Sequence, residues 1–382
     1  MLRTIGIAMN ICSTIEFIND EYGGPAVSLP NLLLSLNNNY DVDNVILSAK
    51  ESNDSCENSI IKKAGIPWFT YEISKFNKLR YSREFGRLLS KYAADSDILF
   101  ANNLWNYVPY KTYAYAKSNN IPLVTSIRGT LSPWSLSQGY VRKKIAWGVF
   151  QRRMLNDSAL VHVTSEDEFK AVRSLGVTSN ILYSSHGIVT PDRVHEDKEF
   201  FKERLGLDKN KRYFLFMSRL HKKKGLDLLL RVWRRLSHRN KDWVLLVAGP
   251  DYGNYQEQLS LPQTKYLGML TGELKDAAFY CSDFFVLPTF SENFGVVIGE
   301  ALARGLPVLT TNNAPWQNIN NIGCGNSFDL SESNLSNVLN DYFSQSKLEL
   351  IQRGDLGRKY ILNDYSWEKK AQEFHQELTK VL

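Results

Sequence analysis

Short runs of apolar residues alternate along the chain with longer stretches in which the apolar positions recur at the helical period. In the first half, the short runs predict strands at 5–12, 43–50, 97–103, 122–128 and 159–165. Helical patterns such as residues 26–40 lie between them. This order is typical of βαβ units on a parallel sheet.

The same alternation begins again in the second half of the chain. Strands are expected at 212–220, 242–250, 265–270, 283–290 and 306–313. Residues 187–200, which contain a proline and a charge cluster, have the composition of a hinge. We therefore predict an α/β protein of two doubly wound, Rossmann-like domains, 1–188 and 189–366. Ligands of open parallel sheets bind outside the carboxyl ends of the strands, so functional residues are expected in the loops after strands.

Composition adds little to this picture. The 382 residues suffice for two domains, and 43% hydrophobic and 23% charged residues are ordinary for a globular protein. The net charge of +6 suits an anionic ligand or membrane surface but is too small to indicate nucleic-acid binding. The cysteines are too far apart for a zinc motif or a disulfide framework: Cys12, Cys56, Cys281 and Cys324. No signal peptide and no transmembrane-length apolar run are visible, so a cytoplasmic location is expected.

Two glycines, Gly23 and Gly24, follow the first predicted strand in the stretch EYGGPAVS and precede a helix. Glycines at such a place allow the backbone to approach a phosphate or a sugar closely. A simple turn between strand and helix explains them equally well, and both interpretations stay open. The spacing is not GxGxxG, so a dinucleotide site is not indicated.

Basic residues follow the first strand of the second half, in the stretch SRLHKKKGLDLLL. Arg219 stands at the strand end, and Lys224 stands just before Gly225 and the next helix. A guanidinium fork, an ammonium group and the amides of a helix N-terminus together suit a diphosphate. A solvated basic turn is the alternative, and it is the favoured interpretation for Lys222 and Lys223.

Two glutamates stand eight positions apart in TFSENFGVVIGEALARG. Eight helical residues turn about 80° beyond two full turns, so Glu292 and Glu300 would not share a helix face. Glu292 is instead predicted in the loop beside the amides of Phe294 and Gly295, and Glu300 inside the helix. A carboxylate in so apolar a helix needs a partner, which sugar hydroxyls can supply. The alternative is that both glutamates are surface residues.

With these motifs the chain resembles the family 4 retaining glycosyltransferases, which have the two-domain GT-B fold. The resemblance extends from YGGP to the final helix, and its most specific part is the Glu-x7-Glu motif of Glu292 and Glu300. It implies two domains facing a cleft and a C-terminal helix, 367–382, that crosses back to the N-terminal domain. RGTLSPW and NNAPWQ are similar to a branch that serves bacterial polysaccharide synthesis, such as that of O-antigen or capsule.

The resemblance also implies how a UDP- or GDP-type sugar donor is held. Glu300 would bind the ribose, with Met269 and Leu270 near the base. Arg219 and Lys224 would neutralise the diphosphate, which Gly24 would approach from the N-terminal domain. The donor sugar would be held by Glu292 and by the backbone of the next four residues, Asn293, Phe294, Gly295 and Val296.

The implied reaction retains the anomeric configuration by front-side attack, with a donor phosphate oxygen accepting the acceptor's proton. No cofactor or metal is expected, because no DxD pair stands at a strand end and the Arg219–Lys224 pair can balance the charge. The acceptor would be a glycan or an undecaprenyl-diphosphate-linked sugar. A sugar-nucleotide epimerase of the same fold and a non-catalytic sugar-nucleotide-binding protein remain alternatives.

Several positions depart from the family pattern, among them Ser218 in place of a usual glycine and SSHG, 184–187, in place of a common Pro-Asn-Gly. Arg128 stands where many members have a histidine that contacts the donor sugar, and Asn102 stands where they have a second histidine. Because its planar fork is always charged, Arg128 is expected to contact the sugar or the diphosphate. His186 is interpreted as a satisfied linker histidine in preference to a cleft residue.

Two basic stretches, 76–92 and 140–155, interleave arginine and lysine with apolar residues. Either can be an amphipathic helix that lies on the anionic cytoplasmic face of the inner membrane. Either can equally be a helix that packs on the core and exposes a basic face. The residues alone do not decide between these interpretations.

Overall fold

A computed structural model describes residues 8–18, 24–51, 58–73, 79–131, 133–192, 198–253, 255 and 257–382. The chain divides into two compact units. The first comprises Met1–Gly187 together with Trp367–Leu382, and the second comprises Ile188–Ser366. Each unit has its own parallel sheet and its own hydrophobic core.

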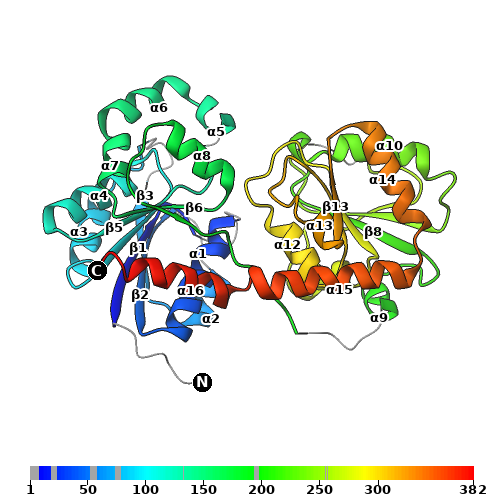
Figure 1. The fold of residues 1–382 in the computed structure, drawn as a ribbon, viewed down its shortest axis with the longest axis horizontal. Helices are drawn as coiled ribbons and strands as arrows, with labels where there is room; N and C mark the ends of the chain where they lie inside the picture. Colours follow the sequence, from blue (N-terminus) through cyan, green and yellow to red (C-terminus); the bar gives the residue numbers. More distant parts are fainter. Residues whose placement is uncertain are drawn as a thin grey trace. The chain divides into compact units, whose positions relative to one another are not determined.

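The first unit is built on seven parallel strands in the order β3-β2-β1-β4-β5-β6-β7 (Figure 1). They are β1 (Met9–Ile15), β2 (Val42–Glu51), β3 (Trp68–Ile73), β4 (Ile98–Asn102), β5 (Leu123–Ser126), β6 (Leu160–Val163) and β7 (Ile181–Tyr183). The helices of the first half are α1 (Gly24–Asn39), α2 (Ser59–Ala64), α3 (Arg83–Tyr92) and α4 (Tyr107–Asn119). They are followed by α5 (Pro133–Ser137), α6 (Tyr140–Ala146), a π-helical turn (Trp147–Gln151), α7 (Arg152–Asp157) and α8 (Glu166–Ser174). The strand order reverses between β1 and β4, which is where open α/β sheets bind ligands.

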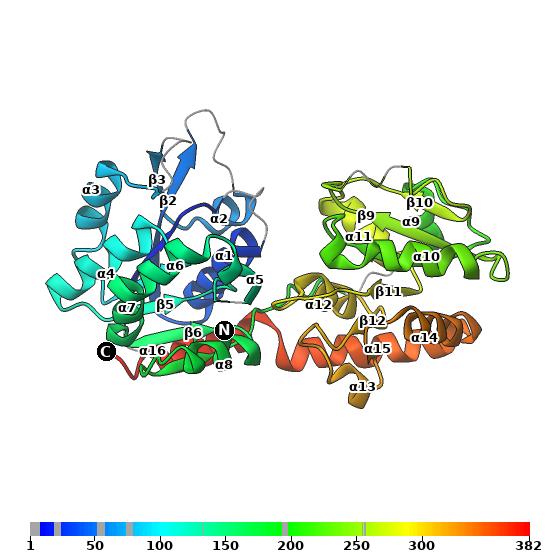
Figure 2. The same cartoon turned by 90° about the horizontal axis from the view of Figure 1, so that it is seen from above.

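The C-terminal helix α16 (Trp367–Leu378) belongs to the first unit (Figures 1 and 2). Its Trp367, Phe374 and Leu378 are buried in one cluster with Leu29 and Leu33 of α1. These positions recur at helical spacing, so one apolar stripe on each helix faces the other. The predicted return of the last helix to the N-terminal domain is thus confirmed.

The second unit has six parallel strands in the order β10-β9-β8-β11-β12-β13. They are β8 (Arg212–Met217), β9 (Trp243–Ala248), β10 (Thr264–Tyr266), β11 (Phe284–Leu287), β12 (Val308–Thr311) and β13 (Gly325–Phe328). The helices are α9 (Lys198–Arg204), the 3-10 turn Lys222–Lys224, α10 (Leu226–Leu236), α11 (Gly272–Tyr280), α12 (Val296–Ala303), α13 (Ile319–Ile322), α14 (Glu332–Ser344) and α15 (Lys347–Asp364). Here the strand order reverses between β8 and β11, so this sheet also has a switch point.

The prediction of two doubly wound parallel sheets is confirmed, with differences in detail. The sequence pattern did not indicate β3, β7 and β13, each of which is an edge strand of its sheet. The strand expected at 265–270 is only Thr264–Tyr266, because the backbone turns at Gly268, whose φ is 70°. The basic helix expected at 140–155 is instead α6, the π-helical turn and α7 in succession.

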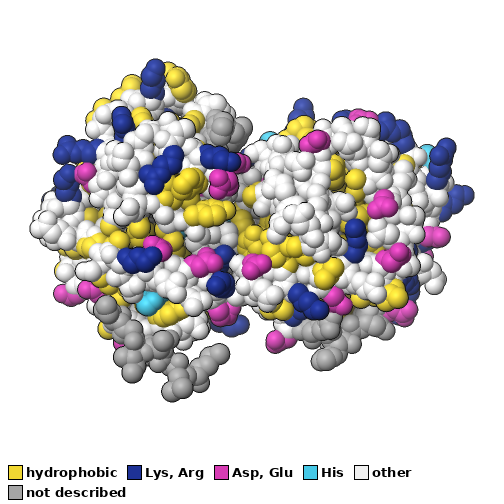
Figure 3. Space-filling view, viewed as in Figure 1, with side chains coloured by type: hydrophobic (Ala, Val, Ile, Leu, Met, Phe, Trp, Pro, Cys, Tyr) yellow, Lys and Arg dark blue, Asp and Glu magenta, His cyan; other side chains and the backbone are white. Residues whose placement is uncertain are grey.

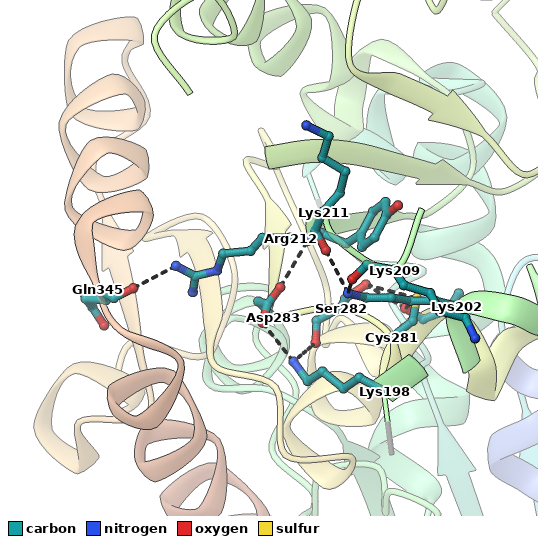
Figure 4. A network of polar contacts seen from close by, with 11 residues as sticks. Lys198, Lys202, Lys209, Lys211, Arg212, Cys281, Ser282, Asp283 and Gln345 are labelled. Atoms are coloured by element: carbon teal, nitrogen blue, oxygen red, sulfur yellow. Dashed lines mark hydrogen bonds and ion pairs between the residues drawn. The ribbon is translucent and has the colours of Figure 1, made fainter. Parts of the chain in front are cut away.

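A polar network holds the amino ends of β8 and β11 together (Figure 4). The Asp283 carboxylate accepts the Tyr213 amide at 3.0 Å and the Lys198 ammonium at 3.0 Å. Arg212 lies over the Trp243 ring, at 4.0 Å from its centroid, and donates to the Gln345 carbonyl at 2.9 Å. This network sets the pairing of the two strands on either side of the switch point.

Candidate functional site

The site of the second unit lies in the loops that follow β8 and β11. The Phe290 amide and the Thr289 hydroxyl both donate to the Lys223 carbonyl, at 2.8 and 3.0 Å. Gly225, with φ of 76°, lies so close to Pro288 that a Cβ atom would be 1.9 Å from the Pro288 carbonyl oxygen. The two loops are therefore locked together, although they are far apart in the sequence.

This locking brings Lys224 and Glu292 into a direct ion pair. The Lys224 ammonium lies 2.5 Å from a Glu292 carboxylate oxygen, and the two side chains are only 12% and 14% exposed. Arg219, in the same loop after β8, is exposed, and among the described residues it makes no hydrogen bond or ion pair. The pKa of Lys223 is lowered by burial first, and further by the charges of Lys224 and Arg219. Cations are thus concentrated in the loops at the switch point.

The loop that carries Glu292 is shaped by packing behind it. Phe294 is 5% exposed and packs against Trp316, whose indole nitrogen donates to the Phe294 carbonyl at 2.5 Å. Gly295, with φ of 78°, is the N-cap of α12, and Val296 is the first residue of that helix. Glu292 and the half-buried Asn293 lie in the loop, so the predicted difference between the two glutamates agrees with the structure.

Glu300 lies inside α12, and its partner in the structure is a side chain. The Lys275 ammonium of α11 donates to the Glu300 carboxylate at 2.7 Å, where Glu300 is 18% exposed. One turn further along, Arg304 pairs with Asp276 at 2.6 Å, so two ion pairs join α11 to α12. The sequence reasoning missed Lys275, and only the pairing of the two helices identifies it.

Of the other expected donor residues, two lie in the loop after β10 and one lies at the start of α1. Met269 is 66% exposed and Leu270 half-buried, in the loop after β10. That loop is tied to the neighbouring strand by the Gly249 amide, which donates to the Gly268 carbonyl at 2.7 Å. Gly24 is the first residue of α1 in the first unit, whereas Gly23 lies outside the described residues.

Arg128 follows β5 in the first unit and connects three elements there. Its Nε donates to Asn102 Oδ1 at 2.8 Å, and its Nη1 donates to Ser28 Oγ of α1 at 2.7 Å. Burial lowers the pKa of the guanidinium to about 10, and the charge of Glu168 opposes this shift. Arg128 and Asn102, both of which depart from the family pattern, therefore contact each other.

Two histidines lie near Arg128. His162, in β6, is buried between Ser126 Oγ at 2.9 Å and the Ser184 carbonyl at 2.8 Å, and burial lowers its pKa to about 3. Burial and the Arg128 charge hold the pKa of His186 well below its ordinary value. The sequence reasoning did not single out His162, although its place inside a predicted strand indicated a buried residue.

Several findings bear on the other expectations. Within the described ranges, no three His, Cys, Asp or Glu side chains are grouped as metal ligands. Among the helices that the structure describes, none is both long and apolar enough to span a bilayer. Cys12, Cys281 and Cys324 are buried and free, while Cys56 lies outside the described residues.

Comparison with known proteins finds similarity to glycosyltransferases in part of the chain. Residues 197–323 match the sequence model of the family described as Glycosyl transferases group 1. An uncharacterized glycosyltransferase of Methanocaldococcus jannaschii, MJ1607, is 27% identical over 121 residues, which is 30% of this chain and 31% of that protein. The putative teichuronic acid biosynthesis glycosyltransferase TuaC of Bacillus subtilis is 27% identical over 200 residues, or 51% of this chain and 48% of TuaC. The chain thus spans less than half the length of these relatives.

The fold is shared over almost the whole chain with solved structures. The structure of HepE from Anabaena in complex with UDP and glucose has a TM-score of 0.76 at 16% identity. The alignment covers 97% of this chain and 100% of that one. The likeness at this identity concerns the fold. Residues 197–323 are thus similar to the group 1 glycosyl transferases, and the chain shares its fold with HepE.

Proposed function

We propose that the protein is a retaining glycosyltransferase that moves a sugar from a UDP- or GDP-type donor to a glycan or undecaprenyl-diphosphate-linked acceptor. The observation that carries the proposal is the Lys224–Glu292 pair beside Arg219 at the switch point of the second sheet. This group lies after β8 and β11 and falls within the region that matches the family. HepE, which has the same fold, was crystallised with UDP and glucose.

In this proposal, Arg219 and Lys224 neutralise the donor diphosphate. A guanidinium and an ammonium stabilise the charge that develops on the leaving phosphate as the sugar departs. The proposal assigns Met269 and Leu270 to the base and the backbone of Gly24 to the diphosphate. Arg128 is the fourth proposed catalytic residue, beside Arg219, Lys224 and Glu292.

Lys224 and Glu292 then act together. When a diphosphate takes the Lys224 ammonium, the Glu292 carboxylate loses its partner and becomes free to accept hydroxyls of the donor sugar. The amides of the loop from Asn293 to Val296 hold the sugar from the same side. When the ribose binds, the Glu300 carboxylate gives up its ion pair with Lys275 and accepts hydrogen bonds from the ribose hydroxyls.

The proposed chemistry breaks the bond between the anomeric carbon and the diphosphate oxygen. The acceptor hydroxyl attacks the same face of the sugar, and its proton passes to an oxygen of the departing phosphate. The new glycosidic bond therefore keeps the anomeric configuration. No metal is needed where two cations already balance the diphosphate.

The experiment is a screen of the purified protein against UDP- and GDP-sugars, with EDTA and separately with Mg²⁺, with and without glycan acceptors. Release of nucleoside diphosphate with a product of retained configuration by NMR supports the proposal. A nucleotide sugar converted to its epimer indicates an epimerase, and binding without turnover indicates a non-catalytic protein. The Arg219→Gln variant is the control for activity from contaminants.

The relatives suggest a biosynthetic setting. TuaC is named for teichuronic acid biosynthesis, which supports a role in bacterial surface polysaccharide synthesis, such as that of O-antigen, capsule or exopolysaccharide. A lipid-linked acceptor would be embedded in a membrane, and the enzyme would have to reach it there. We therefore also propose peripheral contact with the inner membrane.

The α6 region carries the residues for such contact. Val141, Ile145 and Val149 are four positions apart and 62–72% exposed, next to the exposed Arg142 and Lys144. Hydrophobic and basic side chains lie together at the tip of the first unit, over α6 (Figures 1 and 3). By contrast, Phe85 and Leu89 of α3 are buried in the core. In the described part of 76–92, the helix therefore packs on the core, and we do not assign it to the membrane surface.

Vesicle flotation tests this contact. The protein is expected to float with phosphatidylglycerol vesicles at low salt and to remain in the bottom fraction with phosphatidylcholine vesicles. The double variant Ile145→Ser, Val149→Ser should lose flotation, because it removes the apolar part of the surface. If the wild type does not float with anionic vesicles at low salt, the membrane proposal is wrong.

A further inference from the structure

Arg128 is held in an unusual setting at the carboxyl edge of the first sheet. It has a φ of 44°, a left-handed conformation that costs a non-glycine residue free energy. From its place after β5 the side chain reaches Asn102, the last residue of β4, and Ser28 of α1. Both of these partners are buried. The fold therefore fixes the guanidinium near the switch point between β1 and β4.

The partners of this guanidinium are neutral. Asn102 offers an amide oxygen and Ser28 a hydroxyl, and in the described part of the chain Arg128 makes no ion pair. The charge of the Glu168 carboxylate acts on Arg128. The oxygens of that carboxylate, however, accept hydrogen bonds from other groups. One of them accepts the Gly129 amide, and the other accepts the Thr164 amide at 2.6 Å and the Thr164 hydroxyl at 2.9 Å.

The two nearby histidines do not supply a counter-charge. His162 and His186 are both held in their neutral forms near pH 7, since burial lowers the pKa of each. Arg128 itself keeps its charge at that pH, because its pKa stays near 10. A half-buried charge whose hydrogen-bond partners are neutral is costly, and a ligand of opposite charge lowers that cost.

The guanidinium retains donors for such a ligand. Of its five N–H groups, the contacts to Asn102 and Ser28 use one on Nε and one on Nη1. The Nη2 group has no hydrogen-bond partner among the described residues. A fork with free donors and a fixed orientation matches the oxygens of a phosphate or carboxylate.

We propose that Arg128, positioned by Asn102 and Ser28, forms an anion-binding subsite in the first unit that takes a phosphate or carboxylate group of a substrate. The identity of that substrate rests on the proposed function, but the binding of an anion does not. The anion has two possible sources: the diphosphate of the nucleotide donor, or an acidic group on the acceptor.

Isothermal titration calorimetry of the full chain tests the subsite. The probes are UDP and GDP, then inorganic phosphate and D-glucuronate added to protein saturated with the nucleotide that binds. Arg128→Gln is expected to weaken the binding of the relevant anion ten- to a hundredfold, as the loss of a charge-assisted hydrogen bond does. Arg128→Lys keeps the charge without the fork, so its affinity for the anion should lie between those of the wild type and Arg128→Gln.

Asn102→Asp is the sharper variant. It has the shape of asparagine but places a carboxylate against the guanidinium, so it supplies internally the charge that the ligand would bring. Anion binding should fall as in Arg128→Gln. The thermal unfolding midpoint should fall too, because the Asn102 amide nitrogen donates to the Thr14 and Phe100 carbonyls, at 3.3 and 3.2 Å, and a carboxylate oxygen cannot. If Arg128 had a purely structural role, the wild type and Asn102→Asp would bind the anion equally well.

The pattern of losses identifies the source. If Arg128→Gln weakens UDP or GDP binding, the anion is the donor's phosphate. If nucleotide binding is unchanged but phosphate or glucuronate binding to the saturated protein is lost, the anion belongs to the acceptor. Arg219→Gln, in the second unit, should affect only the nucleotide.

The proposal is overturned if wild type and Arg128→Gln have the same affinity for every probe, or if the wild type binds none of them. Arg128-dependent anion binding without transfer in the nucleotide-sugar screen would leave the subsite standing and remove the proposed function. The two proposals can therefore fail separately.

Discussion

At the residue scale, the two glutamates of the Glu-x7-Glu motif lie in different environments, so their substitution should have different effects on activity and binding. Glu292→Gln, in the loop beside the α12 amides, is expected to lower turnover ten- to a hundredfold with nucleoside diphosphate affinity nearly unchanged. Glu300→Gln should mainly raise the Kd for the nucleoside diphosphate by a similar factor. A hydrogen bond to a charged group is worth about 1.5–3 kcal/mol, which sets these factors.

Steady-state kinetics and calorimetry with the donor found in the screen check this division. The two variants serve as controls for each other, because both replace a carboxylate by an amide of the same shape. Equal losses of nucleotide affinity in both, with turnover intact, would show that the assignment of the two glutamates is mistaken.

The Lys224–Glu292 pair makes a second prediction at this scale. Lys224→Met leaves a carboxylate that is only 14% exposed without its partner, so the free energy of unfolding should fall by about 1–3 kcal/mol. The double variant Lys224→Met, Glu292→Gln should recover most of that loss, since the uncompensated charge is gone. It should not recover nucleoside diphosphate binding, which needs the ammonium.

Denaturant unfolding of the four proteins in this cycle measures the coupling. If the destabilisations of the two single variants simply add in the double variant, the pair does not interact in solution. Rescue of stability without rescue of binding is the combination that assigns Lys224 to the ligand.

At the element scale, Gly295 sets the geometry of the loop before α12. Alanine there meets φ of 78°, which costs about 1–2 kcal/mol, and its Cβ would lie 2.9 Å from Glu292 Cγ. Gly295→Ala should therefore lower both the unfolding midpoint and the turnover. Gly24 is the matched control, because an added Cβ has nothing within 4 Å.

Thermal unfolding and kinetics of the two alanine variants separate packing from ligand contact. Gly24→Ala should leave the free energy of unfolding within about 0.5 kcal/mol of the wild type. A loss of donor affinity in that stable variant supports the proposed approach of the backbone to the diphosphate. Wild-type stability and turnover in Gly295→Ala would contradict the role given to this turn.

Elements differ in how far local pattern predicts them. The central strands of both sheets are buried on two faces and appear as apolar runs, so β8, β9, β11 and β12 were predictable. The missed strands lie at sheet edges, and β13 reads Gly-Asn-Ser-Phe, with no apolar run at all. Its extended form comes from pairing with β12, which local sequence does not encode.

At the scale of the whole molecule, buried histidines make stability depend on pH. The pKa of His162 is about 3 in the folded protein and near 6.5 in an unfolded chain, so the unfolded state binds the proton first. This contribution is complete above pH 6.5 and is lost as the pH falls from 6.5 toward 3. By pH 5 the loss from His162 is about 2 kcal/mol.

Unfolding free energies of wild type and His162→Gln between pH 7 and 5 test this. The wild type should lose about 2 kcal/mol more than the variant over that interval, because glutamine does not titrate. Comparing the two proteins removes the share of the groups that do not interact with His162. Parallel curves would mean that His162 is not held neutral by burial.

The sequence by itself determined the two-sheet architecture and the loops that carry Arg219, Lys224, Glu292 and Glu300. Periodicity is a local property, and it marks where a strand ends and a helix begins. The tertiary structure decided which side chains meet. The pairs Lys224–Glu292, Lys275–Glu300, Arg128–Asn102 and Arg128–Ser28 join residues 68, 25, 26 and 100 positions apart. Such contacts arise from strand order and from close packing between loops, which leave no periodic trace along the chain.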